Sequence, residues 1–249
     1  MNIFKSSYIR ENIEKTLKKT RFEREKEIYK NGMKENLRGK IAEKVIVDLC
    51  NKKNKTNEEQ YILKNMFKKD VCFAEVLSNK YKSDIKITFK DETCSYVSIK
   101  NTGCSVVGAC EVTCDSFNNF FNNKKLARVM KKYESLRFNL TELLSKYQND
   151  YNYLKQFLYK NIDKYLKFIL TGTGANLPPD YIIFIDKKSD YIYCSSIDEY
   201  INNLIIYSSL GSLESHTIMT RTSGKYCNLK IKVMNPIKNK KIIEKFINK

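Results

Sequence analysis

The spacing of apolar residues changes several times along this chain, and each change predicts a different element. Apolar positions three, four and seven residues apart predict an amphipathic helix over 40–50, directly after Gly39. The densely charged segment 7–30 predicts one or two exposed helices, and 57–69 predicts another short helix. The apolar stripe of the 40–50 helix consists of Ile41, Ala42, Val45, Ile46 and Leu49.

Alternating apolar and polar residues predict strands. "SDIKITFK" (83–90) and "CSYVSIKN" (94–101) form a predicted hairpin across a polar turn that contains Asp91 and Glu92. Further extended segments are "VCFAEVLS" (71–78) and "ACEVTC" (109–114), the hairpins 181–196 and 217–233, and between these a short helix in "IDEYINNLI" (197–205).

Residues 117–168 contain neither Gly nor Pro, and their repeated Leu, Tyr and Phe positions predict two or three helices. The segment "TGTGANLPPD" (171–180) ends them. The order of elements is therefore helix, strands, helices, strands, which is typical of a mixed α/β domain built on a central sheet. We expect a single domain over 1–249 with a helical insertion around 117–168.

The net charge of the chain indicates which class of molecule it binds. The chain has 46 Lys and Arg against 28 Asp and Glu, a net charge of +18. Such an excess favours a polyanion, nucleic acid rather than a membrane surface, although an AT-rich genome would also load a protein with Lys, Asn and Ile. The apolar runs are too short to span a bilayer and the N-terminus carries no apolar secretion segment, so we expect a cytoplasmic protein.

Eight cysteines and a single histidine limit the possible chemistry. The cysteines are expected to be reduced thiols. Cys104, Cys110 and Cys114 lie close in sequence, but no CxxC pair occurs, so a zinc site is not expected. The single His216 counts against Ser/His/Asp and Cys/His catalysis. By elimination, a carboxylate, a lysine and a metal ion are the favoured catalytic groups.

The first predicted hairpin carries Asp84 on one strand and Lys100 on the other. Phosphodiester hydrolysis is helped by a metal ion held by an acidic group and by a cation near the attacking water. Because strand side chains alternate, Ser98 and Lys100 share one face and Ile99 points to the core. A metal-dependent nuclease of the PD-(D/E)xK kind has an acid where this chain has Ser98. On this pattern alone, an ordinary hairpin with a solvated Asp and Lys is the better interpretation.

Three segments carry more specific patterns: "GKIAEKVIVD" (39–48), "YKSDIKITF" with "VSIKNTG" (within 81–103), and 170–233, which contains "LTGTGANLPPDYIIFID" and "GSLESHTIMTRTSGKYCNLKIKV". In this order they resemble the type II restriction endonucleases of the MspI kind and their GCGC-cutting relatives. The helical middle of the chain is similar to that group in kind only. That group has an amide side chain in place of the usual acid. A polar residue without a charge at position 98 is therefore compatible with the group, although a serine departs further from its pattern.

This resemblance implies a restriction-endonuclease-like (PD-(D/E)xK) fold, a mixed central sheet flanked by helices. It implies Mg²⁺-dependent cleavage of double-stranded DNA at a short G/C palindrome such as GCGC. It further implies a monomer or weak dimer on DNA without an obligate protein partner, belonging to a restriction-modification system whose DNA methyltransferase acts separately. The alternatives are a structure-selective repair or recombination nuclease, and a non-catalytic DNA-binding protein on a degenerate nuclease fold.

The resemblance also assigns roles to the site residues. Asp84 is the metal ligand, and Lys100 positions the nucleophilic water or stabilises charge. Ser98 is a weak ligand or holds a metal-bound water, and the backbone carbonyl of Ile99 is a further ligand. Glu43, on the predicted 40–50 helix, orients water or binds a second ion.

Base recognition requires side chains that reach the edges of G and C. Three loops rich in small polar residues are candidates, 101–110, 171–177 and 215–226, and the last is favoured because Arg221 and Lys225 flank a predicted turn. Contact with phosphates alone is the alternative, above all for Lys225. The cations of the 117–137 segment, such as Arg128, could also follow the DNA backbone, although a charge run is more often a solvated face. The predicted DNA-binding residues are Asn101, Thr171, Thr173, His216, Arg221, Thr222, Ser223 and Lys225.

Overall fold

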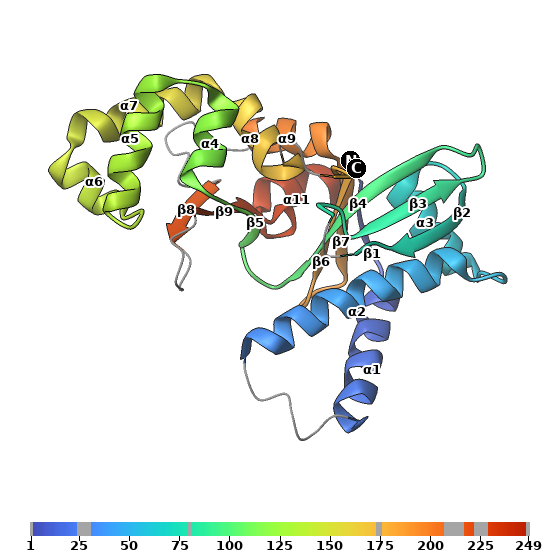
Figure 1. Cartoon of the computed structure of the whole chain (residues 1–249). Helices are drawn as coiled ribbons and strands as arrows, with labels where there is room; N and C mark the ends of the chain where they lie inside the picture. Colours follow the sequence, from blue (N-terminus) through green and yellow to red (C-terminus); the bar gives the residue numbers. More distant parts are fainter. Residues whose placement is uncertain are drawn as a thin grey trace. The chain divides into compact units, whose positions relative to one another are not determined.

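The computed structural model describes residues 2–23, 31–78, 81–172, 176–206, 217–221 and 229–247. The chain forms two compact units (Figure 1). Unit 1 comprises 1–105, 175–200 and 235–249, and unit 2 comprises 106–174 and 201–234. None of the helices in the described part of the chain is long and apolar enough to cross a membrane.

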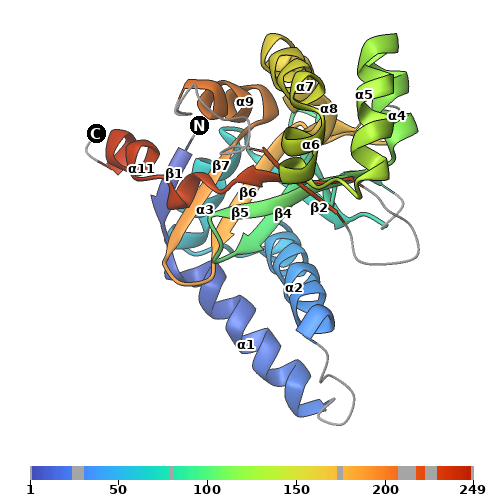
Figure 2. The same ribbon diagram turned by 90° about the vertical axis from the view of Figure 1, so that its left-hand side faces the viewer.

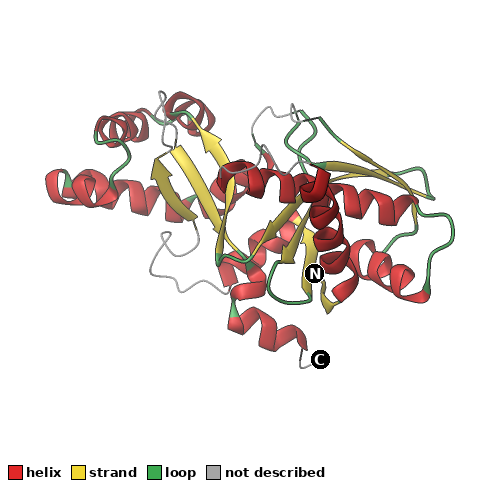
Figure 3. Ribbon diagram, turned by 90° about the horizontal axis from the view of Figure 1, so that it is seen from below, coloured by secondary structure: helices red, strands yellow, loops and turns green. Residues whose placement is uncertain are grey.

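Unit 1 is built on a six-stranded sheet with the order β1-β7-β6-β4-β3-β2, whose strands are labelled in Figure 1 and drawn in yellow in Figure 3. The two central strands β4 and β6 pair in parallel, and the other neighbours pair antiparallel, so the sheet is mixed as expected. The predicted hairpins 83–101 and 181–196 are confirmed as β3–β4 and β6–β7. The strands are β1 (Asn2–Lys5), β2 (Val71–Val76), β3 (Ile85–Phe89), β4 (Cys94–Thr102), β6 (Tyr181–Asp186) and β7 (Tyr191–Ser196).

Three helices cover one face of this sheet, namely α1 (Ser7–Glu23), α2 (Asn31–Asn51) and α3 (Asn57–Phe67). The predicted apolar stripe of α2 is buried in a core with Val97, Ile99 and Ile183 of the sheet. The helix begins earlier than predicted, so Gly39 lies inside it rather than before it. The expectation that the N-terminal helix is exposed is wrong on one side, because α1 buries Ile9, Ile13 and Leu17.

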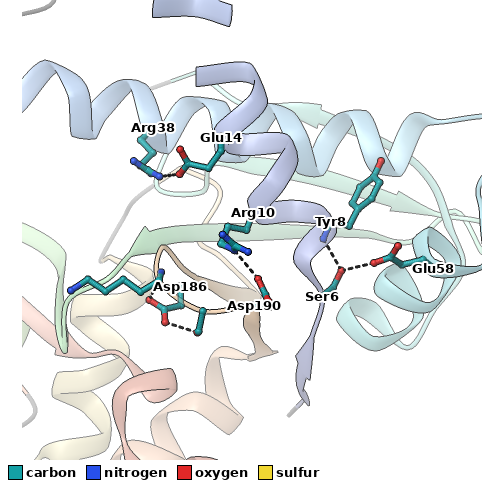
Figure 4. A network of polar contacts seen from close by, with 10 residues as sticks. Ser6, Tyr8, Arg10, Glu14, Arg38, Glu58, Asp186 and Asp190 are labelled. Atoms are coloured by element: carbon teal, nitrogen blue, oxygen red, sulfur yellow. Dashed lines mark hydrogen bonds and ion pairs between the residues drawn. The ribbon is translucent and has the colours of Figure 1, made fainter. Parts of the chain in front are cut away.

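Polar contacts fix α1 against its neighbours in unit 1 (Figure 4). Ser6 donates a hydrogen bond to Glu58 at the start of α3, and Arg10 pairs with Asp190 in the β6–β7 turn at 2.7 Å. Glu14 pairs with Arg38 of α2. The last of these contacts joins α1 to α2, the helix that leads to the site described below.

The opposite face of the sheet carries a second apolar layer. Phe184 and Tyr193 contact the ring of Tyr200 in the first turns of α9 (Ile197–Ile206), and all three side chains are fully buried. A 3-10 turn, η1 (Pro236–Lys238), packs on β6 and β7, and α11 (Lys240–Ile247) packs on β1 and η1. This second layer therefore covers the half of the sheet that is formed by β1, β7 and β6.

A side chain from α2 forms hydrogen bonds with the free backbone edge of strand β2. The Asn51 amide donates to the Ala74 carbonyl at 2.8 Å and accepts from the Ala74 amide at 2.7 Å. An unpaired strand edge invites pairing with another chain, and a side chain bound to the backbone prevents it. The free backbone of β2 is therefore partly satisfied within the unit.

Unit 2 contains a second sheet, three antiparallel strands in the order β5-β9-β8, which are labelled in Figure 1; Figure 2 gives the view turned by 90°. The predicted extended segment 109–114 corresponds to the end of β5 (Val106–Val112), which belongs to this second sheet and not to the central one. Its partners β8 (Thr217–Arg221) and β9 (Leu229–Met234) confirm the predicted last hairpin.

The helical stretch of unit 2 forms five helices where two or three were predicted. Their core is aromatic, with Phe117, Phe121 and Phe168 in mutual ring contact. The helices are α4 (Cys114–Phe121), α5 (Lys124–Ser135), α6 (Leu140–Lys146), α7 (Gln148–Lys160) and α8 (Ile162–Thr171).

Candidate active site

The candidate site lies in unit 1 where β3 begins and β4 runs on past it. β3 pairs with β4 only as far as Ile85, opposite Val97. Beyond Val97, β4 runs on to Thr102 with β6 on one side, and among the described strands none lies on the other. This leaves an open edge of β4 beside the start of β3, and α2 packs against the strand there.

Asp84 occupies this opening. It precedes β3 by one residue, so the prediction that it lies on the strand is corrected by one position. Its Oδ2 accepts a hydrogen bond from the backbone amide of Ile99 at 2.6 Å and from the hydroxyl of Ser98 at 3.1 Å. The carboxylate therefore takes the place of a strand neighbour for the exposed edge of β4.

The backbone of Asp84 is held as firmly as its side chain. Its amide donates to the Val97 carbonyl and its carbonyl accepts from the Leu77 amide, both at 2.9 Å. The preceding Ser83 is buried and donates to the Leu177 carbonyl at 2.7 Å. Such a carboxylate is fixed before any ligand arrives, which favours tight positioning of a bound group.

Ser98, Ile99 and Lys100 follow the predicted alternation. Ile99 is buried in the core beneath α2, and Lys100 is half-buried two residues beyond Ser98 on the same side of β4. Within the described part of the chain, Lys100 forms no hydrogen bond or ion pair. A lysine without a structural partner beside a fixed carboxylate is available to act on a ligand.

Glu43 of α2 joins this group. Burial raises the pKa of Glu43, and the charge of Asp84 raises it further, whereas Lys40 and Lys100 act in the opposite direction; the net shift is upward. These influences show that Glu43, Asp84 and Lys100 share one electrostatic environment. The structure thus brings together all four residues that the sequence predicted for catalysis: Glu43, Asp84, Ser98 and Lys100.

A raised carboxyl pKa makes a prediction about stability. The folded protein favours neutral Glu43, so the contribution of this group to stability is present below the unfolded-state pKa and is lost as the pH rises through the folded-state pKa. Glu43→Gln should therefore raise the thermal unfolding midpoint at pH 7 without divalent ions, by a few degrees at most, while cleavage falls. The difference in midpoint should shrink towards pH 4. A lower midpoint for the variant at pH 7 would show that Glu43 is a stabilising residue instead.

The donor set fits a hard divalent cation. Oδ1 of Asp84 accepts no hydrogen bond from the described residues, so it is free to bind a ligand. Because the N–H and C=O of one strand residue point to the same side, the Ile99 carbonyl also faces the open edge. In the described ranges, no three His, Cys, Asp or Glu side chains lie close enough together to hold a metal ion. Among the described residues, the carboxylates that this site offers to a metal ion are therefore only two, those of Asp84 and Glu43. Mg²⁺ is often held by one or two carboxylates, with waters and substrate phosphates completing its shell.

The predicted DNA-binding residues are not brought together in the same way. Asn101 lies on β4 with its side-chain nitrogen buried and without a hydrogen-bond partner among the described residues. Thr171 ends α8 and its hydroxyl donates to the Lys167 carbonyl at 2.8 Å. Arg221 is the last residue of β8, and its side chain is not described. The predictions for Thr173, His216, Thr222, Ser223 and Lys225 lie outside the described residues.

Two residues near the site were not predicted from the sequence. Lys40 lowers the pKa of Glu43 and lies three residues before it on α2, a spacing that places both side chains on one helix face. That spacing could have indicated Lys40. Ser83 is the second, and no local pattern could have indicated it, because its partner Leu177 is 94 residues away.

A comparison with protein-family models finds no match, and a comparison with curated proteins finds none either. Among solved structures, the chain is similar to restriction endonuclease MspI in complex with its cognate DNA. The TM-score is 0.65 at 17% sequence identity, over 91% of this chain and 97% of that one. The chain therefore has a restriction-endonuclease-like fold, as predicted.

Proposed function

We propose that this protein is a type II restriction endonuclease that hydrolyses double-stranded DNA at a short G/C palindrome, with GCGC as the proposed site and Mg²⁺ as the cofactor. One observation carries the proposal: Asp84 is locked onto the Ile99 amide and the Ser98 hydroxyl, beside Lys100 and Glu43, in a restriction-endonuclease-like fold. The neighbour in that fold was solved with its cognate DNA.

Each residue of the candidate site has its own proposed role in hydrolysis. A bound Mg²⁺ would polarise the phosphate and lower the pKa of a water. Asp84 Oδ1, the Ile99 carbonyl and Glu43 would hold it. Lys100 positions the attacking water and stabilises the negative charge that develops on the phosphate. Double-stranded DNA is the partner, and Arg221 with the 215–226 segment is the proposed site of base recognition, followed by 101–110 and 171–177.

Ser98 stands where a metal-dependent nuclease of the PD-(D/E)xK kind usually has an acid. Its hydroxyl donates to Asp84 at 3.1 Å and the side chain is buried, so it orients the Asp84 carboxylate. We propose that Ser98 adds to this a hydrogen bond to a metal-bound water. The site then has one charged ligand fewer, and substrate phosphate oxygens must complete the metal shell.

Ser98→Ala should slow cleavage by roughly 10-fold, the effect of one lost hydrogen bond. The loss is small because the Ile99 amide still holds Asp84 at 2.6 Å. Single-turnover cleavage rates at saturating DNA measure the effect. A loss as complete as that of Asp84→Ala would show instead that Ser98 is an essential ligand.

Incubating a plasmid with the protein and Mg²⁺ tests the proposed function. A fixed set of limit fragments is the expected result. Nicking that depends on DNA structure would favour a repair or recombination nuclease. Tight binding without any cut would favour a DNA-binding protein on a degenerate nuclease fold, an outcome that the serine at position 98 makes worth testing. An EDTA reaction is the control for the metal.

A further inference from the structure

A cationic surface on unit 2 is unexplained by the candidate active site. Helix α5 carries five cations and a single acid among twelve residues. All five cationic side chains are exposed, whereas Leu126, Val129, Met130 and Tyr133 are buried. We call these cations the α5 cationic face: Lys124, Lys125, Arg128, Lys131 and Lys132.

The helix geometry makes this face continuous. With 3.6 residues per turn, the five cations fall within an arc of about 120° that contains no acid. Lys124, Arg128 and Lys131 follow one line along the helix, over about 10 Å of its length. The only acid of α5, Glu134, lies outside that arc and is half-buried.

The α5 cationic face is poorly neutralised. Lys132 pairs with Asp150 of α7, and Lys125 lies over the Tyr153 ring, 4.3 Å from its centroid. The remaining three, Lys124, Arg128 and Lys131, form no ion pair or hydrogen bond with any residue in the described ranges. Three unpaired cations in one line can therefore all engage the same external anion.

This arrangement of cations destabilises helix α5. Two lysines stand in the first turn, where the helix dipole disfavours positive charge. Arg128 is spaced three or four residues from Lys124, Lys125, Lys131 and Lys132, and like charges at these spacings repel. Asn123 caps the helix through its side chain, which offsets part of this repulsion. A polyanion laid along the helix would offset this repulsion.

We propose that the α5 cationic face binds the phosphate backbone of duplex DNA without reading its sequence. This rests on the proposed function, because it takes the polyanion to be the substrate of the candidate active site. DNA rises 3.4 Å per phosphate along one strand, so the line from Lys124 to Lys131 spans roughly three steps from one phosphate to the next along the duplex axis. Lysine and arginine contacts of this kind add affinity and salt dependence but no base specificity.

The test compares two triple variants with the same loss of charge. K124Q/R128Q/K131Q removes the unpaired line of cations, and K18Q/K53Q/K64Q removes three exposed lysines of unit 1. Affinity for a duplex without G/C palindromes is measured in EDTA by fluorescence anisotropy at several salt concentrations. Thermal unfolding checks that both variants fold, and the first should be at least as stable as the wild type.

We expect K124Q/R128Q/K131Q to bind at least about 10-fold more weakly, and the slope of log K against log salt to fall by about 2 to 3. K18Q/K53Q/K64Q should stay within about 2-fold of the wild type. Equal losses in both variants, or no loss in the first, would overturn the inference. So would poly-glutamate binding to the wild type as tightly as the duplex does.

The cleavage assay separates this inference from the proposed function. Site-specific cleavage with unchanged affinity in K124Q/R128Q/K131Q would refute DNA binding by the α5 cationic face and support the proposed nuclease function. If the wild type never cuts DNA and that variant shows the expected loss of affinity, DNA binding by the α5 cationic face is supported and the proposed nuclease function is refuted.

Discussion

Asp84→Asn is expected to abolish cleavage, a loss of roughly 1000-fold or more, because it removes the charge that would hold the metal ion. The amide oxygen can still accept from the Ile99 amide and the Ser98 hydroxyl, so the local structure should survive. Asp84→Ala should lose cleavage equally and stability in addition. It leaves the part-buried Ile99 N–H without its partner, and losing one such hydrogen bond costs about 1 kcal/mol.

The two Asp84 variants separate catalysis from folding. Single-turnover rates at saturating DNA report cleavage, and denaturant unfolding reports stability. Equal stability of Asp84→Asn and wild type, with cleavage lost, is the expected result. Near wild-type cleavage by Asp84→Asn would remove Asp84 from the proposed metal site.

Lys100→Ala is the second large effect, with an expected loss of cleavage of about 100- to 1000-fold. Lys100 makes no hydrogen bond or ion pair with other described residues, so its removal should change stability little. The matched control is Lys86→Ala on the neighbouring strand β3. Lys86 lies 3.4 Å from Glu75 and is placed in no part of the proposed chemistry, so that variant should cut normally.

Lys100→Arg sharpens the test of what Lys100 contributes. An arginine keeps the positive charge, but its broad, planar guanidinium cannot occupy the position of a compact ammonium. Partial cleavage by Lys100→Arg would show that charge matters by itself, and none would show that position matters as well. If Lys100→Ala and Lys86→Ala cut equally well, Lys100 has no role in hydrolysis.

Local pattern predicted the elements of unit 1 well. The apolar stripe of α2, the β3–β4 hairpin and the β6–β7 hairpin follow directly from periodicity, because each buries one face or two against the same core. Periodicity could not reveal which strands share a sheet. β5 pairs with β9, more than 100 residues away, and nothing local distinguishes that partner from β4.

The helices of unit 2 were undercounted for a specific reason. Their breaks contain neither Gly nor Pro, the residues taken as helix breakers. Asn122 ends α4 in the left-handed conformation, and Asn123 and Asn139 cap the helices that follow. Asparagine adopts that conformation and caps helices more readily than most residues, so these asparagines were the available signal.

The candidate site could be predicted in its parts but not in its geometry. The spacing of Asp84, Ser98 and Lys100 indicated a shared face, and Glu43 followed from the helix. That Asp84 stands just outside β3, and binds the open edge of β4, depends on where the pairing of two strands stops. Strand pairing ends where the backbones diverge, and the sequence carries no local mark of that point.

Sequencing every DNA end that the protein produces with Mg²⁺ tests the central claim most directly, with Lys100→Ala as the blank. We expect all wild-type ends to fall at a fixed position within one short G/C palindrome, and the blank to produce at least about 100-fold fewer ends. Ends scattered over unrelated sequences, or ends equally abundant in the blank, would contradict a site-specific nuclease built on Asp84, Ser98 and Lys100.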